Sequence, residues 1–404
     1  MRIIHPSIIG DKLDKKTITI VAVIAIVVLV IGAYAVMNGS VSDEEKEKQQ
    51  KEEDAKKGGL YLLKADIIPV DMGGLAGTPK VVESLTEMYT AVYGKLPAAA
   101  EKLTIEDAKK DTEFWNTFCT YEKTAKRNSD GSITYSSVYK TGSNEVTEYT
   151  IPNNGATKLI GTGGGYMYAL YYLLCTKYNV EPFSDAAIKN KDLLKEFQSI
   201  PYSGLNLSSI AVSSQALADM YPASYLSRCT SLQYYDMETL GNDAKAASDG
   251  GKETVVLMAS SSMNAKVTEV TELITEAGGY CLFNNAKGIP QTFQMIEAVG
   301  YILGYGDYVD SLMESLELKL YKLYWAGKQQ DGASHKAYME SSSGKAISAT
   351  GNAAVCCRFF GWDTSLMDGK EHDTESLLNE KPDIIMFYTN DTRDMDTKMR
   401  ATNV

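Results

Sequence analysis

The sequence predicts an α/β protein of two lobes with parallel-rich sheets, joined by one long helix and preceded by an N-terminal transmembrane helix. Three observations predict it. Residues 254–283 alternate strand, helix and strand, a pattern that needs parallel pairing with a right-handed crossover. Residues 290–327 keep apolar positions at helical spacing throughout. Residues 17–40 carry no charge and are mostly apolar.

The apolar segment 17–40 has the length of a membrane span, because twenty helical residues reach roughly 30 Å. Lys12, Lys15 and Lys16 precede it, so the positive-inside rule places residues 1–16 in the cytoplasm. We therefore expect a single-pass cell-membrane protein with an extracellular C-terminal region. The alternative is a cleaved signal peptide, whose apolar region is usually shorter, and the sequence leaves cleavage open.

Residues 41–59 form a charged stalk. Glutamates precede lysines by four residues, as in Glu44/Lys48 and Glu52/Lys56, and Gly58-Gly59 ends the run. This pattern is typical of a solvated spacer, which would hold the remaining chain away from the membrane.

The composition argues for a globular extracellular part and against a nucleic-acid partner. The hydrophobic content is 44% and the formal net charge is −12. The six cysteines form no CxxC pair, which argues against a structural zinc site. Disulfides are permitted outside the cell, but the sequence leaves their pattern open. The neighbours Cys356 and Cys357 are expected to be buried on a helix.

Residues 60–130 are expected to form an accessory helical region. Thr104-Ile-Glu-Asp107 has the pattern of a helix start. The sequence assigns this region no function.

The first lobe is predicted to span residues 131–288. A hairpin at 133–151 opens it, because Thr, Tyr, Val and Ser are enriched around a polar turn. Its further elements are strands starting at Lys158, at 254–258 and at 280–283, and helices at 166–178 and 266–277.

The linking helix is predicted at 289–327, with a bend near Gly304 and Gly306, and the second lobe at 328–404. The lobe's expected elements are a strand at 337–340, a helix at 351–360, a helix capped by Thr374, and a buried strand at 382–387. The chain ends at Val404 soon after that strand, so an incomplete second lobe is expected.

The sequence offers no catalytic motif, so we expect a non-enzyme without an intrinsic cofactor or metal. It contains neither GxSxG nor HExxH, and it has only three histidines. The glycine-rich turn 161–165 matches neither the P-loop nor the GxGxxG pattern, which argues against nucleotide binding. An ectoenzyme is the least favoured alternative.

Candidate ligand-binding residues follow predicted strands, because ligands of open α/β folds lie outside the carboxyl ends of strands. They comprise Thr162 and Gly163 of the glycine-rich turn, and the serines of two polar loops, Ser260, Ser261, Ser341 and Ser342. Tyr166 and Tyr168 follow the turn, and tyrosine rings suit a planar or amphipathic ligand. Ordinary packing is the competing interpretation for the tyrosines.

Several motifs resemble, in their order, the substrate-binding proteins of ABC importers for iron–siderophores, haem and cobalamin. The likeness covers about residues 133–390 and includes Val146–Pro152, Lys158-Leu-Ile-Gly-Thr-Gly163 and Thr254–Ser260. The best match runs from Tyr338-Met-Glu-Ser-Ser-Ser-Gly-Lys345 through Glu375 to Phe387. The resemblance implies two α/β lobes bridged by a long helix and a ligand held between them.

The resemblance also implies partners. Such proteins dock on arginines of the permease through one surface glutamate per lobe, and the matching positions are Glu238 and Glu375. The expected ligand is an iron–siderophore, haem or cobalamin, and the expected partners are an ABC permease and its ATPase. The alternative is a surface adhesion or structural protein that retains the fold without transport.

Overall fold

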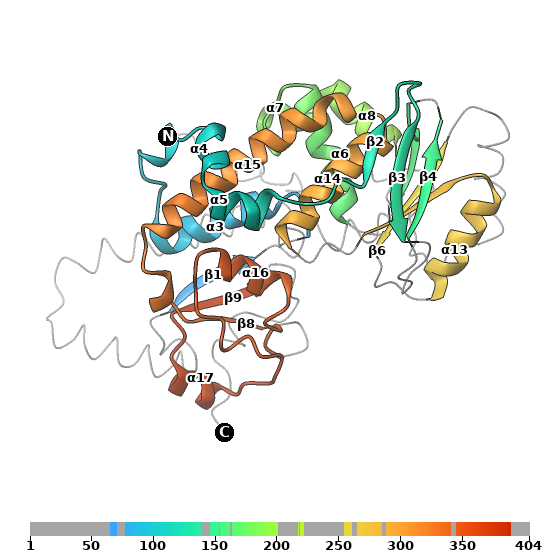
Figure 1. The fold of residues 1–404 in the computed structure, drawn as a ribbon. Helices are drawn as coiled ribbons and strands as arrows, with labels where there is room; N and C mark the ends of the chain where they lie inside the picture. Colours follow the sequence, from blue (N-terminus) through green and yellow to red (C-terminus); the bar gives the residue numbers. More distant parts are fainter. Residues whose placement is uncertain are drawn as a thin grey trace, which may run out of the picture. The chain divides into compact units, whose positions relative to one another are not determined.

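The computed structural model describes residues 65–70, 77–138, 146–152, 154–161, 164–200, 217, 219–221, 254–260, 265–284, 288–340 and 345–388. These residues form two parallel sheets, one antiparallel sheet and helices that pack on them (Figure 1). The predicted α/β class with parallel sheets is confirmed. Within this part of the chain no helix is long and apolar enough to cross a membrane. The predicted transmembrane helix 17–40 and the stalk 41–59 lie outside the described residues.

The first lobe contains a parallel sheet in the order β5 (Lys158–Gly161), β6 (Val255–Ser260) and β7 (Tyr280–Asn284). Helix α13 (Ala265–Glu276) connects β6 to β7 and packs on both strands. Val255 to Met258 of β6 are all buried, as expected for a central strand covered on both faces. The predicted strand–helix–strand unit is therefore confirmed.

The predicted hairpin is also present. Strands β3 (Ile133–Val138) and β4 (Val146–Ile151) pair antiparallel, and β2 (Ala125–Arg127) adds to β3. Side chains of β3 contact the backbone of β7: the Tyr135 hydroxyl donates to the Cys281 carbonyl oxygen at 2.9 Å. The Phe283 amide donates to Ser137 Oγ at 2.9 Å. These bonds satisfy backbone groups of β7 that its own ladder leaves open.

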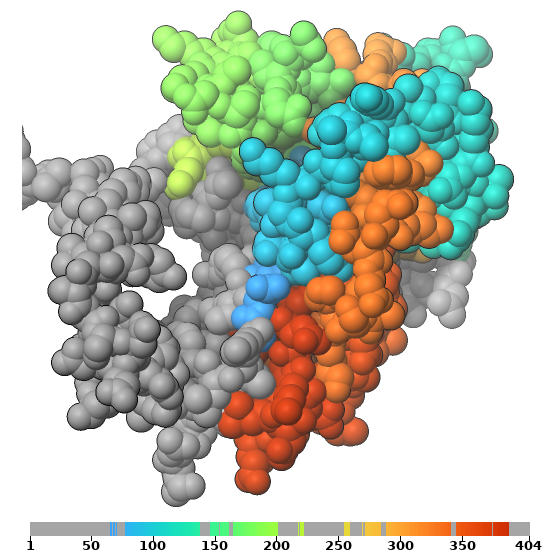
Figure 2. Space-filling view, turned by 90° about the vertical axis from the view of Figure 1, so that its left-hand side faces the viewer, coloured from blue at the N-terminus to red at the C-terminus, as the bar shows by residue number. Residues whose placement is uncertain are grey.

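The second lobe contains a parallel sheet in the order β1 (Asp66–Val70), β9 (Ile384–Tyr388) and β8 (Ala337–Met339). Strand β1 comes from the region 60–130, for which the sequence indicates helices. It pairs with β9 in a register that sets Ile68 opposite Met386. Figure 2 shows β1, in blue, against the second lobe in red and the helical segment in cyan. The lobe expected to be incomplete thus receives a strand from the N-terminal side.

The rest of this region is helical, as predicted. Its elements are α3 (Val81–Tyr93), η3 (Ala100–Lys102), α4 (Ile105–Lys110), α5 (Thr112–Phe114) and η4 (Trp115–Cys119). Thr104 and Asp107 cap each other: the Asp107 amide donates to Thr104 Oγ1, and the Thr104 amide donates to Asp107 Oδ2 at 2.9 Å. Elements α3, η3 and α4 pack along α15 (Gly306–Lys328).

The predicted single linking helix is two helices, α14 (Ile289–Ile302) and α15. Gly304 ends the first with φ of +79°, in the left-handed region that glycine favours at helix ends. A Cβ at Gly304 would lie 2.8 Å from the Asn154 carbonyl oxygen. The Ala156 amide donates to the Ile302 carbonyl oxygen at 2.6 Å. The chain before β5 therefore packs against the C-terminal end of α14.

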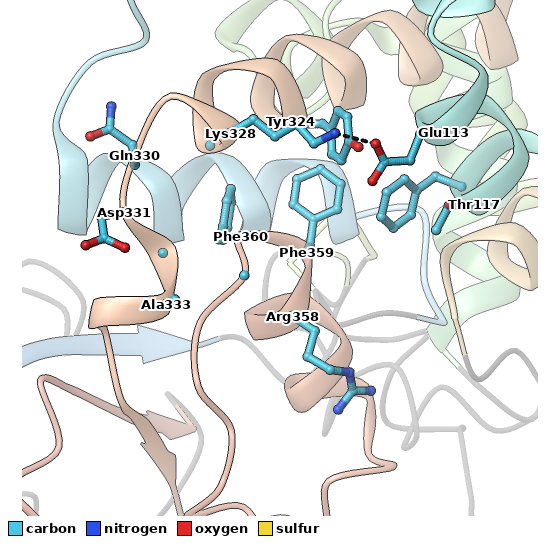
Figure 3. Close-up of a pocket in the computed structure, with 14 residues that line it drawn as sticks. Glu113, Thr117, Tyr324, Lys328, Gln330, Asp331, Ala333, Arg358, Phe359 and Phe360 are labelled. Carbon is cyan, nitrogen blue, oxygen red and sulfur yellow. Dashed lines mark hydrogen bonds and ion pairs between the residues drawn. The ribbon is translucent and has the colours of Figure 1, made fainter.

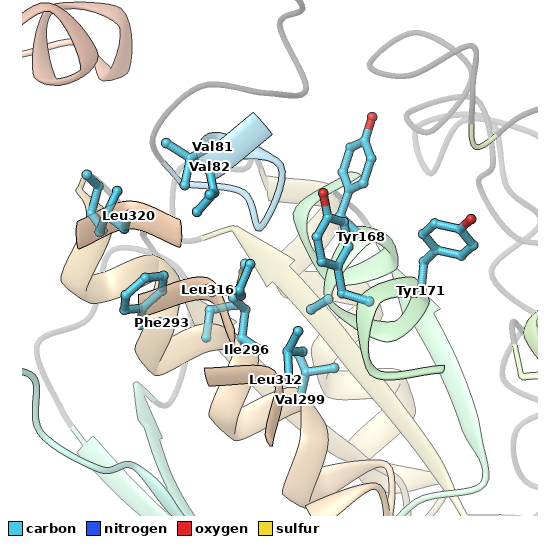
Figure 4. Packing of buried hydrophobic residues seen from close by; sticks show 14 of the residues in the cluster. Val81, Val82, Tyr168, Tyr171, Phe293, Ile296, Val299, Leu312, Leu316 and Leu320 are labelled. Carbon is cyan, nitrogen blue, oxygen red and sulfur yellow. The ribbon is translucent and has the colours of Figure 1, made fainter. Parts of the chain in front are cut away.

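Helix α6 (Gly164–Lys177) is the centre of the core (Figure 4). Every residue from Tyr166 to Cys175 is buried, so the helix is enclosed on all sides. It packs against α14, α15 and α8 (Lys191–Ser199), and α7 (Asp185–Ile188) lies between α6 and α8 in the chain. The linking helices are thus part of the first lobe's core.

The second lobe also holds η6 (Gly332–Ser334), α16 (Asn352–Phe359) and α17 (Thr374–Glu380). Cys356 and Cys357 are fully buried on α16, which confirms that prediction. All cysteines of the described segments are buried, and they are Cys119, Cys175, Cys281, Cys356 and Cys357. Burial raises the pKa of Cys175 and of Cys281 to about 12, so these thiols are unreactive at neutral pH.

Candidate functional site

The strands of each parallel sheet end at a common edge. In the first lobe β5 ends at Gly161, β6 at Ser260 and β7 at Asn284. Ser260 lies opposite Asn284 in the ladder, so the ends of two neighbouring strands are level. Thr162, Gly163, Ser261, Ser341 and Ser342, which follow strand ends, lie outside the described residues.

Connections that follow strands of the two parallel sheets meet at three residues, Gly77, Gly165 and Thr292. Gly77 follows β1 of the second lobe, Gly165 opens α6 after β5, and Thr292 lies in the first turn of α14 after β7. The Gly77 amide donates to Thr292 Oγ1 at 2.8 Å. The Thr292 hydroxyl in turn donates to the Gly288 carbonyl oxygen at 2.9 Å. We call Gly77, Gly165 and Thr292 the strand-end junction.

Gly165 permits a close approach at this junction. A Cβ on Gly165 would lie 3.2 Å from the Gly77 carbonyl oxygen and 3.5 Å from the Met295 sulfur. A side chain would therefore push the two lobes' connections apart. The glycines of the run 161–165 were expected to let the backbone approach a ligand or the partner lobe, and Gly165 approaches Gly77, which follows a strand of the other lobe.

The two candidate tyrosines are buried in α6. Tyr166 is 4% exposed and Tyr168 is 0% exposed. The ring of Tyr168 lies edge-on to that of Phe183 at 6.1 Å. Both side chains are therefore part of the packed core beside the strand-end junction, and a role in ligand contact stays a prediction.

Glu375 lies on the surface in the first turn of α17. The Asp373 side chain caps this helix by accepting from the Ser376 amide at 2.7 Å. Within the described residues no ion pair engages Glu375. A fixed helix thus presents its carboxylate to solvent. Glu238, the matching position of the first lobe, lies outside the described residues.

A pocket of about 450 Å³ lies where the end of α15 meets α16 (Figure 3). Phe359 and Phe360 line it together with Lys328. Lys328 Nζ donates to Glu113 Oε2 at 2.6 Å and lies 4.7 Å from the centre of the Tyr324 ring. The ammonium group is engaged inside the protein, and we assign no ligand to this pocket.

Within the described segments no group of three or more His, Cys, Asp or Glu side chains could hold a metal ion. His372 Nε2 lies 3.0 Å from Asp368 Oδ1, and His335 Nδ1 lies 3.0 Å from the Asp331 carbonyl oxygen. These local contacts hold both rings in place.

The junction was missed by the sequence analysis, although a signal was present. Residues 73–77 read Gly-Gly-Leu-Ala-Gly, and only two residues separate them from the apolar run Ile67-Ile-Pro-Val70. Such a run followed by glycines is typical of a strand and its turn. The partner residue Thr292 has no comparable signal.

Comparison with known proteins finds similar solved structures only at low identity. No protein-family model matches the chain, and no curated protein matches it. The chain is similar to the TroA-like periplasmic binding protein FepB from Veillonella parvula. The similarity covers 60% of this chain and 67% of that protein, with 12% identity and a TM-score of 0.44.

Two further solved structures are from Veillonella parvula DSM 2008. A periplasmic solute binding protein is 12% identical over 64% of this chain and 71% of the other, with a TM-score of 0.40. A periplasmic binding protein is 10% identical over 63% of this chain and 72% of the other, with a TM-score of 0.44. All three are named as periplasmic binding proteins.

Proposed function

We propose that this chain is a membrane-anchored extracellular solute-binding protein that delivers an iron chelate, haem or a corrinoid to an ABC importer. The observation that carries the proposal is the strand-end junction. Connections from the carboxyl ends of β1 in one lobe and of β5 and β7 in the other meet there. Because open α/β sheets bind ligands beyond their carboxyl ends, one ligand could contact both lobes.

The polar loops after strands of the two parallel sheets are the proposed ligand contacts. They include Thr162 and Gly163 after β5, Ser260 and Ser261 at the end of β6, and Ser341 and Ser342 after β8. Hydroxyl and backbone groups at such positions suit a large chelate with peripheral polar groups.

The ligand is tested with the full chain in detergent micelles. Haem, cobalamin and a ferric siderophore are each added, and tryptophan fluorescence and the melting temperature are measured. We expect one of them to bind. At a ligand concentration one hundred times Kd the folded state gains about 2.7 kcal/mol, which raises the melting temperature. If none of the three changes either signal, the transport function is wrong and the adhesion or structural alternative gains support.

The permease contact is tested at Glu375. We expect Glu375→Ala combined with Glu238→Ala to abolish ligand uptake in cells that carry the importer, with unchanged ligand affinity of the purified chain. Glu375 is exposed in the first turn of α17, so its loss should cost less than about 1 kcal/mol of stability.

Glu276→Ala, an exposed position at the end of α13, is the matched control and should leave uptake intact. Reduced ligand affinity of the Glu238/Glu375 double variant would contradict a docking role, and so would normal uptake.

A further inference from the structure

A second pocket, of about 500 Å³, shares no residue with the strand-end junction. It lies among α4, η4, α14, α15 and the segment after η4. Its lining residues are Lys109, Trp115, Cys119, Thr120, Tyr121, Lys123, Glu297, Asp310, Met313, Glu314 and Glu317. Four of these side chains are carboxylates and two are ammonium groups, so the pocket has an excess of negative charge.

Glu297 supplies a buried carboxylate to this pocket with one oxygen unsatisfied. Its side chain is 2% exposed, and Oε1 accepts from Lys123 Nζ at 2.7 Å. Oε2 is fully buried and has no hydrogen-bond partner within the described part of the chain. A buried acceptor without a donor is destabilising, and more so when it is charged. Oε2 of Glu297 therefore lacks a donor, whereas Oε1 has Lys123.

The other three carboxylates lie on one face of α15. Asp310, Glu314 and Glu317 follow each other at intervals of four and three residues. Asp310 and Glu314 are exposed, whereas Glu317 is buried. Burial, together with the carboxylates of Glu314 and Glu297, raises the pKa of Glu317 to about 7 against the opposing effect of Lys109 and Lys123.

Aromatic and apolar side chains form the rest of the wall. Trp115 and Tyr121 are half-buried, and Met313 is buried beside them. Lys109 Nζ lies 5.9 Å from the centre of the Trp115 ring, so the protein already places an ammonium group over this ring. The remaining titratable groups of the wall, Cys119 and Tyr121, have pKa values raised by burial and stay neutral.

We propose that this pocket binds a small organic cation that carries an alkylammonium group on an aromatic or apolar body. The ammonium group would pair with Glu297 and Glu317 and replace Lys123, whose side chain is 67% exposed and can turn into solvent. The body would lie against Trp115 and Tyr121. The carboxylates select positive charge, and the rings select an organic ligand over a hydrated metal ion.

Binding is measured by calorimetry with the full chain in micelles, using phenethylamine as the probe and phenethyl alcohol as its neutral analogue. We expect the amine to bind and the alcohol not to bind. The amine should bind about tenfold more tightly at pH 8 than at pH 6, because Glu317 must lose its proton to pair with the ligand.

Three variants separate the roles of the carboxylates. Glu297→Gln should weaken amine binding at least tenfold, and Glu317→Gln should remove the difference between pH 6 and pH 8. Glu106→Gln, an exposed position on α4 outside the pocket, is the matched control and should change neither.

The proposal is wrong if the amine does not bind at either pH, or if the alcohol binds equally well. It is also wrong if the control weakens binding as much as Glu297→Gln does. If the Glu297→Gln variant does not fold, the pH dependence of amine binding to the Glu317→Gln variant still tests the proposal. Failure of chelate binding would leave these results unaffected, because the two sites share no described residue.

Discussion

Replacing Ile68 by aspartate is expected to lower the free energy of unfolding by more than about 3 kcal/mol. Ile68 is 2% exposed in β1 and lies opposite Met386 of the central strand β9. A carboxylate at this position would be buried between the sheet and α3, which contacts β1. Because β1 belongs to the second lobe's sheet, replacing the Ile68 side chain should destabilise the second lobe, although residue 68 precedes the first lobe in the sequence.

Urea unfolding of the full chain in micelles measures this effect. Trp362 is a suitable probe, because it is 2% exposed and its Nε1 donates to the Tyr93 hydroxyl of α3 at 2.7 Å. Asp66→Asn at the exposed start of β1 is the control and should change stability by less than about 0.5 kcal/mol. An unchanged unfolding midpoint for Ile68→Asp would mean that β1 does not pair with β9.

Replacing Glu196 by glutamine is expected to cost about 1–3 kcal/mol at pH 7. Glu196 of α8 accepts from Lys177 Nζ at 2.8 Å, from the Tyr178 hydroxyl at 2.8 Å and from the Tyr305 hydroxyl at 2.7 Å. Tyr305 lies at the break between α14 and α15. The Glu196 carboxylate therefore connects α6 and α8 to the turn between the two linking helices. Glutamine keeps the size of the side chain but offers only one oxygen.

The same variant predicts a pH dependence. Burial would raise the pKa of Glu196, but the bonds from Lys177, Tyr305 and Tyr178 outweigh it and hold the pKa below the ordinary value of 4.5. The stabilisation is therefore present at neutral pH and is lost as the pH falls below 4.5 through the lowered pKa. Urea unfolding at pH 7 and at decreasing acidic pH should show the wild type approaching the variant. A constant difference across that range would show that the charge of Glu196 does not matter.

Local sequence signals predicted most strands and helices of both lobes with small errors at the ends, but not β1, which lies in a region predicted to be helical. The hairpin 133–151, the strands of the first lobe and α16 each carry a complete signal in fewer than twenty neighbouring residues. The helix start at Thr104 was also predictable, because its signal lies within four neighbouring residues. Side-chain period and capping are properties of short segments.

The candidate site was only partly predictable. The sequence predicted polar loops after strands, and β5, β6 and β8 do end at or just before these loops. It assigned Tyr168 to the ligand, and the structure buries that ring in a helix enclosed on every side. An apolar helix that contains tyrosines has the same sequence pattern whether it borders a cleft or lies in a core, because composition does not specify what packs against the helix.

The sequence alone determined the parallel α/β character, the order of elements and the excess of negative charge, since each depends on residue type and short-range spacing. The tertiary structure decided which strand completes the second lobe, where the linking helix breaks, and which carboxylates share a pocket. Strand β1 pairs with β9 more than three hundred residues later, and the Asn154 carbonyl oxygen would lie only 2.8 Å from a Cβ at Gly304. Glu297 and Glu317 come together only because α14 folds against α15. Such contacts depend on packing between distant segments, which spacing along one segment does not encode.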